Sequence, residues 1–130
     1  LNVVPGVIDV SCAPSVMNTT IKIKQLYEGH AKDVLKAAFD ADEDYNKVCA
    51  VVDEDVNIFD FNEVLWAFAT RGRADKRTLV IPDRPGFYRD EHKDHWGRLG
   101  LDATYPFDRA GEFQRNSVPG ESTVDLADYL

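Results

Sequence analysis

The sequence is poor in cysteine and in positive charge, and it contains no long apolar run. Its two cysteines cannot make a disulfide framework, so we expect a chain of the reducing cytoplasm. Lys and Arg number 15 against 23 Asp and Glu, which gives a net charge of −8. Such a surface repels phosphate-rich polymers and anionic lipids, so nucleic-acid and membrane partners are disfavoured. No apolar stretch has the length needed to cross a bilayer.

The sequence does contain enough apolar residues for one packed core. Hydrophobic residues make up 44% and charged residues 29%, a balance typical of a folded domain. At this length we expect a single domain over residues 1–130. The chain begins at Leu1 and its only methionine is Met17, so we interpret it as a processed chain or a piece of a longer protein.

Apolar periodicity predicts short strands and two amphipathic helices. The predicted strands are residues 7–12, 19–25, 47–52 and 78–82. One helical stripe is Ala31, Val34, Leu35 and Ala38, and the other is Phe61, Val64, Leu65 and Phe68. Asp60 with Glu63 predicts a capping box at the second helix, Gly72 its end, and Trp66 a second apolar face suited to a partner subunit.

The order of these elements predicts the fold class. Strands alternate with helices between residues 19 and 82, which favours parallel pairing with right-handed crossovers. We therefore expect an α/β fold, a layered α-β-α sandwich with a mainly parallel sheet. Beyond Asp83, glycines and prolines interrupt the chain and predict an irregular C-terminal tail, in which residues 124–130 form a short helix or a strand.

Three clusters have the residue types of a chemical site. Asp53-Glu54-Asp55 follows the valine-rich strand and suits either magnesium or, more simply, an acidic turn before the next helix. His92 and His95 share a helical face but lack a second ligand set, so solvated surface is the better interpretation. His30 could act as an acid or base, although support of a turn is the commoner use.

Several blocks of the chain resemble the UbiD-type decarboxylases. The longest runs from Val51 to Asp60 and continues from Glu63 to Arg71. The others, in the family's order and spacing, are Val4-Pro5-Gly6-Val7, Ile23-Lys24, Gly29-His30-Ala31-Lys32 and Gly100-Leu101-Asp102-Ala103-Thr104. All of them resemble the C-terminal domain of the family, a small part of the whole polypeptide.

The resemblance implies reversible, non-oxidative decarboxylation of aromatic or α,β-unsaturated acids by the parent protein. It implies prenylated FMN as an electron sink, with a divalent metal (Mn or Mg) and potassium. Family members hold these groups and a catalytic Glu-Arg-Glu network in a preceding domain, so we expect this chain alone to contain no catalytic, cofactor or metal residue and to be inactive. The C-terminal domain is implied to mediate homo-oligomerisation and to cover the active site as a lid.

Three residues match substrate-pocket positions of the family. Lys24 matches a lysine that reaches the substrate in some members, with a solvated strand lysine as the alternative. Phe87 implies an apolar contact with an aromatic ring and disfavours a dihydroxybenzoate. Arg89 could pair with a second carboxylate, or remain solvated in its charged loop.

Two other kinds of protein fit the same sequence. One is a stand-alone, non-enzymatic α/β module that oligomerises through the face carrying Trp66. The other is a receiver-like, metal-dependent domain that uses Asp53 and Asp55.

Overall fold

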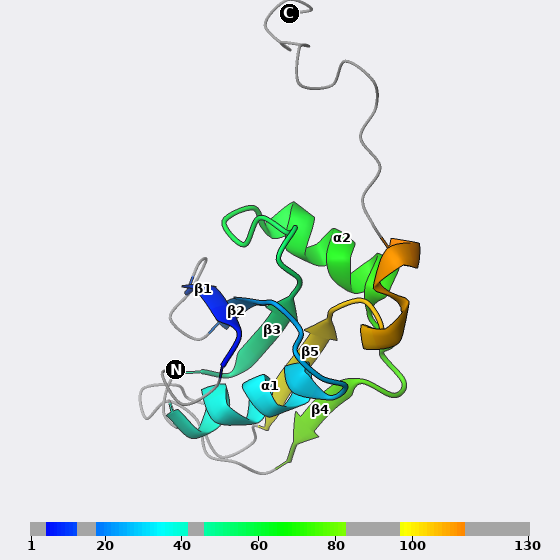
Figure 1. Cartoon of the computed structure of the whole chain (residues 1–130). Coiled ribbons are helices and arrows are strands. Elements are labelled where there is room, and N and C mark those ends of the chain that lie inside the picture. Colours follow the sequence, from blue (N-terminus) through cyan, green and yellow to red (C-terminus); the bar gives the residue numbers. More distant parts are fainter. Residues whose placement is uncertain (1–4, 13–17, 42–45, 83–96, 114–130) are drawn as a thin grey trace, which may run out of the picture.

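The computed structural model describes residues 5–12, 18–41, 46–82 and 97–113. These residues form a layered α/β unit of strands with a helix on each face (Figure 1). In chain order the elements are β1 (Val7–Ser11), β2 (Asn18–Ile23), α1 (His30–Ala41), β3 (Val48–Val52), α2 (Phe61–Arg71), β4 (Thr78–Ile81), β5 (Arg98–Ala103) and the 3-10 segment η2 (Phe107–Phe113). The predicted layered α/β class is confirmed, and residues 124–130 lie outside the described part.

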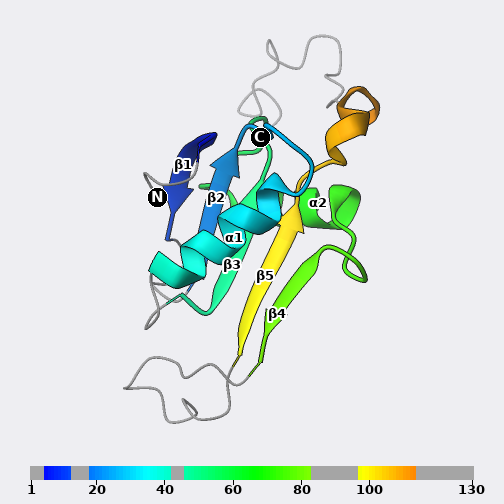
Figure 2. The ribbon, with the colours of Figure 1, turned by 60° about the horizontal axis from the view of Figure 1, so that its bottom comes forward.

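The strands form one mixed sheet in the order β1-β2-β3-β5-β4 (Figure 2). The central strands β2, β3 and β5 are parallel, and each edge strand is antiparallel to its neighbour. The expected parallel pairing thus holds for the three central strands and not for the two edges, and the parallel direction expected of β4 is wrong. The neighbour of β3 on the side of β4 is β5, which lies in the tail expected to be irregular.

The local sequence does not predict β5, because its residues do not form the apolar face that is typical of a buried strand. Arg98 and Asp102 are charged, and Gly100 weakens any isolated strand. Packing leaves little room for a side chain at Gly100, since a Cβ there would lie 3.1 Å from Leu35 Cδ1 of α1 and 3.2 Å from Leu79 Cβ of β4. Pairing with β3 and β4 on its two sides, rather than propensity, makes this segment a strand.

Helix α1 covers one face of the sheet, as its stripe predicts. Val34, Leu35 and Phe39 are fully buried against Ile21 and Ile23 of β2. Burying a side chain of this size stabilises a fold by about 1.5–3 kcal/mol. The predicted stripe is thus confirmed, and so is the alternation of β2, where Ile21 and Ile23 point into the core.

Helix α2 covers the opposite face with a stripe rotated from the predicted one. Its buried residues are Val64, Ala67 and Arg71, whereas Phe61 and Leu65 are 59% and 53% exposed. Placing Phe61 and Leu65 in the core was wrong. The rotation directs Arg71 toward the sheet edge, where a buried carboxylate accepts its hydrogen bonds.

The start of α2 is fixed by Asp60, as predicted. The Asp60 carboxylate accepts a hydrogen bond of 3.0 Å from the backbone N–H of Asn62. Glu63 does not close the predicted capping box, because its Oε1 accepts from the N–H of Asn57 at 3.1 Å instead. The helix ends where predicted, with the Gly72 N–H donating to the Phe68 carbonyl.

Within the described ranges, neither helix is long and apolar enough to cross a bilayer.

Candidate functional site

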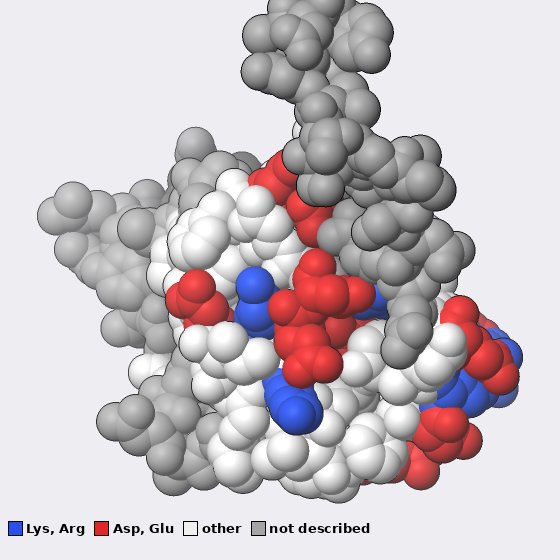
Figure 3. Space-filling model, turned by 45° about the horizontal axis from the view of Figure 1, so that its top comes forward, with Lys and Arg blue, Asp and Glu red and all other residues white. Residues whose placement is uncertain are grey.

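The carboxyl ends of the parallel strands carry a cluster of charged and aromatic side chains. Figure 3 looks onto this end of the sheet, where Asp and Glu side chains gather near the centre with Lys and Arg beside them. Ligands of open α/β sheets bind at this edge. The position of the cluster therefore makes it the first candidate for a functional site.

Asp53 is the buried centre of this cluster. It follows β3 directly and is 1% exposed. Its Oδ2 accepts from the Tyr105 N–H at 2.8 Å and from Arg71 at 3.0 Å, and its Oδ1 accepts from Gln25 Nε2 at 3.2 Å. We call Asp53, Asp55, Arg71, Gln25 and Tyr105 the Asp53–Arg71 cluster. Its members come from four separate segments of the chain and tie the ends of β2, β3, α2 and β5 together.

Arg71 balances two carboxylates at once. Its guanidinium makes a bidentate pair with Asp55 at 2.7 and 2.8 Å, and its NH2 also donates to the Phe113 carbonyl at 2.8 Å. The rings of Trp66 and Tyr105 lie 5.1 and 5.4 Å from the guanidinium carbon, within cation–π range. The hydrogen bonds to Asp55 raise the pKa of Arg71, so it is charged at every accessible pH.

Burial sets the titration of Asp53. Loss of water raises the pKa of its carboxyl to about 6, although the Tyr105 N–H and the Arg71 charge both act to lower it. A carboxyl with this pKa changes charge near neutral pH. The cluster thus combines a fixed positive charge with a titratable acid in a dry environment.

The geometry excludes magnesium at this cluster as it is arranged here. The guanidinium of Arg71 fills the space between Asp53 and Asp55 that a cation bound by both would need. Across residues 5–12, 18–41, 46–82 and 97–113, no three His, Cys, Asp or Glu side chains form a potential metal-ligand set. The simpler interpretation of the acidic run, an acidic turn that leads into α2, holds, with a buried ion pair added. His92 and His95 lie outside the described residues.

His30 is a structural residue, since both of its ring nitrogens bind backbone. Nδ1 accepts from the Leu26 N–H at 3.1 Å, and Nε2 therefore carries the proton and donates to the Pro5 carbonyl at 2.7 Å. The Tyr27 ring stacks on the imidazole at 4.7 Å between centroids. No nitrogen is left for proton transfer, so His30 supports its turn.

Gly6 completes the contact around His30. It has a φ of 86°, and a Cβ there would lie 2.6 Å from His30 Cε1 and 2.8 Å from the Lys24 carbonyl oxygen. Its own carbonyl accepts from the Lys24 N–H at 2.9 Å. Two segments that are far apart in sequence therefore contact each other beside β2. They are Pro5-Gly6 and Gly29-His30.

The structure places one of the three substrate-pocket candidates. Lys24 is exposed just beyond β2 and lines neither of the two hollows described below. Phe87 and Arg89 lie outside the described residues. Sequence reasoning missed Arg71, Gln25 and Tyr105. The one available signal was Arg71 itself, a charge seven residues after Val64 and hence on the buried stripe of α2.

Taken together, these features define a layered α/β domain whose strand ends are joined by a buried ion pair. Comparison with known proteins identifies the family. Residues 1–103 match the model of the 3-octaprenyl-4-hydroxybenzoate carboxy-lyase C-terminal domain. The chain therefore belongs to the UbiD family of decarboxylases and corresponds to their C-terminal domain.

Relatives of known structure or activity support this assignment to the UbiD family. An anhydromevalonate phosphate decarboxylase of Aeropyrum pernix is 36% identical over 106 residues, which are 80% of this chain and 24% of that protein. The UbiD-class enzyme HmfF of Pelotomaculum thermopropionicum, solved with FMN, superposes with a TM-score of 0.87 at 37% identity, covering 99% of this chain and 30% of HmfF.

An evolved dimeric form of HmfF with prFMN gives a TM-score of 0.76 at 34% identity, covering 98% of this chain and 26% of that one. The chain thus spans between about a quarter and a third of the length of these relatives.

Proposed function

We propose that this chain serves as the C-terminal domain of a UbiD-class enzyme that decarboxylates an aromatic or α,β-unsaturated acid, reversibly and without oxidation. In that enzyme the domain covers the active site and contributes to contacts between subunits. The observation that carries the proposal is the agreement with HmfF over 99% of this chain and only 30% of the relative. Because nearly the whole chain matches one part of HmfF, we expect it to serve as the corresponding domain of its own protein.

The reacting groups would then lie on other polypeptide of the same protein. In the described residues, the buried acids near the strand ends, Asp53 and Asp102, are each paired with an arginine, which is consistent with a structural role. Prenylated FMN, a divalent metal and potassium would accordingly be held by a preceding domain. Lys24, Phe87 and Arg89 are our candidates for the side chains that this domain contributes to the substrate pocket.

An exposed apolar surface on α2 supports a role in subunit contacts. Phe59, Phe61, Leu65 and Trp66 are 70%, 59%, 53% and 37% exposed. Phe61 and Leu65 also border an apolar hollow of about 240 Å³ between α2 and the sheet, floored by Ala50 and Leu101. Several exposed large apolar side chains within eight residues are typical of a protein interface. We call Phe59, Phe61, Leu65 and Trp66 the α2 surface.

Separating the chain from the rest of the protein tests the enzymatic proposal. We expect the intact protein, loaded with prenylated FMN, to release CO₂ from an aromatic or α,β-unsaturated acid. Residues 1–130 alone should show neither CO₂ release nor flavin absorbance, because the groups that do the chemistry lie elsewhere. A flavin spectrum that co-purifies with residues 1–130 would overturn this division of labour.

Adding charge to the α2 surface tests the subunit contact. Leu65→Asp should shift the intact protein toward smaller species in sedimentation velocity, because a buried, unpaired carboxylate at an interface is strongly unfavourable. Because Leu65 is exposed in the isolated fold, the substitution should change the free energy of unfolding only a little.

The matched control is Ala41→Asp, which adds the same charge to an exposed position at the end of α1, on the opposite face of the sheet. It should leave sedimentation unchanged. Identical sedimentation of Leu65→Asp and the unmodified protein would remove the α2 surface from the interface.

A further inference from the structure

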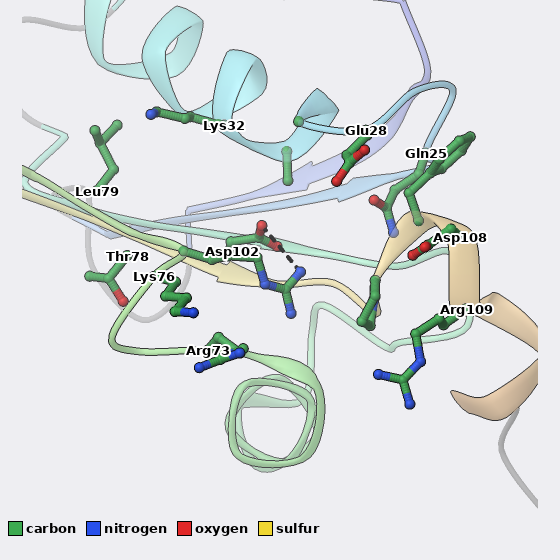
Figure 4. Close-up of a pocket in the computed structure, with 15 residues that line it drawn as sticks. Gln25, Glu28, Lys32, Arg73, Lys76, Thr78, Leu79, Asp102, Asp108 and Arg109 are labelled. Carbon is green, nitrogen blue, oxygen red and sulfur yellow. Dashed lines mark hydrogen bonds and ion pairs between the residues drawn. The ribbon is translucent and has the colours of Figure 1, made fainter.

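A second hollow lies beside the Asp53–Arg71 cluster and is built from different chemistry. It has a volume of about 490 Å³ and lies among the start of α1, the loop between α2 and β4, and the start of η2 (Figure 4). We call it the basic cleft. Asp102 of β5 lies at its centre, between the side chains that come from α1 above and from the loop below.

Basic side chains outnumber acidic ones around the basic cleft. The basic lining residues are Lys32, Arg73, Lys76, Arg77 and Arg109, and the acidic ones are Glu28, Asp102 and Asp108. Asp75 and Glu112 pair with Arg73 and Arg109 at the rim, so the surroundings of the cleft are neutral as a whole, against a net charge of −8 for the whole chain. In an acidic protein, such a place repels anions least.

Part of this positive charge is not used within the fold. Arg77 is committed, since it pairs with Asp102 at 3.5 Å and donates to the Arg71 carbonyl. Lys32 and Lys76 are exposed, and no carboxylate of the described residues lies within ion-pair distance of either. Two ammonium groups, on opposite sides of the cleft, are therefore available to a ligand.

The arginines at the rim are held only by weak surface pairs. Arg73 pairs with Asp75, and Arg109 pairs with Glu112, with more than half of each side chain exposed. Exposed pairs of this kind contribute little and exchange partners readily. Both guanidiniums can turn toward an anion at little cost.

The first turn of α1 adds backbone donors to the same wall. Ala31 and Lys32 line the cleft, and the preceding Gly29 has no side chain to accept from the N–H groups of the first turn. The cleft thus offers charge and backbone donors from separate elements.

We propose that the basic cleft binds the phosphate group of a small organic phosphate. A phosphate monoester carries a charge of about −1.5 to −2 at neutral pH, which the two ammonium groups of Lys32 and Lys76 balance. Its oxygens suit the guanidinium, ammonium and N–H donors that converge here. The cleft would take such a ligand whether or not the parent protein is a decarboxylase.

The test is titration of the intact protein with inorganic phosphate at constant ionic strength, followed by line broadening in phosphorus NMR. We expect saturable binding, and a loss of affinity of at least about tenfold in the double variant Lys32→Ala/Lys76→Ala, which removes two charge-assisted contacts. Lys36→Ala is the matched control, because Lys36 is exposed on the same helix and does not line the cleft. It should bind phosphate as the unmodified protein does.

Three outcomes would overturn the proposal. One is the absence of saturable binding, and another is equal affinity in the double variant and in Lys36→Ala. The third is displacement of phosphate by malonate at equal concentration, which would show that the cleft selects any dianion and not the phosphate group. Phosphate could also bind at a flavin site elsewhere in the protein. Such binding would be equal in all variants, so it would not produce the expected difference between the double variant and Lys36→Ala.

Discussion

Replacing Arg71 by methionine should lower the free energy of unfolding of this chain by about 3–5 kcal/mol. Methionine fills a similar volume, so the loss comes from electrostatics and not from a cavity. Asp53 would remain buried without its positive partner, and Asp55 would lose a bidentate pair. Urea denaturation followed by tryptophan fluorescence, with Trp66 close to the changed side chain, measures the effect.

Arg73→Met provides the matched control two residues further on. Arg73 also pairs with an aspartate, but both side chains are more than half exposed. Its loss should cost far less stability than the loss of Arg71. If the two variants lost equal, small amounts of stability, burial of the Asp53–Arg71 cluster would have no energetic consequence.

A second change separates the cost of an orphaned charge from the value of the pair. In the Arg71→Met background, Asp53→Asn removes the unpaired carboxylate and should restore part of the lost stability. The asparagine oxygen can still accept from the Tyr105 N–H, which donates to Asp53 at 2.8 Å. Additive losses in the double variant would instead mean that each side chain contributes through its own packing.

Local patterns predicted those elements whose partners are local. The stripe of α1, the alternation of β2 and the cap at Asp60 follow from spacing within a few residues, and the structure confirms all three. The strand β5 and the rotation of α2 depend on partners far away in sequence. Gly100 packs closely against Leu35 of α1, and Arg71 is turned inward by Asp53, eighteen residues earlier.

The candidate site also has one part that the sequence predicted and another that depends on the tertiary structure. The run Asp53-Glu54-Asp55 marked the correct edge of the sheet, because acidic residues after a buried strand are visible in sequence. That the cation beside them is Arg71 and not a metal required the tertiary structure. The link between Gly6 and His30 likewise shows only when β1 and the start of α1 are placed side by side.

Titration of Asp53 should make part of the stability of this chain depend on pH between about 4 and 7. Its pKa rises from 3.8 to about 6 on folding, chiefly because burial disfavours the charged form. Between these values the folded chain binds more protons at this site than the unfolded chain, so the contribution of Asp53 is largest at low pH and is lost as the pH rises through about 6. A shift of this size corresponds to up to about 3 kcal/mol.

Comparison with Asp53→Asn isolates this contribution from the other carboxylates. Urea denaturation at pH 4, 5, 6 and 7 gives the free energy of unfolding of both proteins. The value for the unmodified chain minus that for Asp53→Asn should fall as the pH rises. Asp75→Asn should give the opposite trend, because the hydrogen bond from Arg73 lowers the pKa of Asp75, so its contribution is present at neutral pH and lost on acidification. If the Asp53 difference instead grew with pH, the attraction of Arg71 would outweigh the cost of burial, and the carboxylate would be charged throughout the range in which the parent protein works.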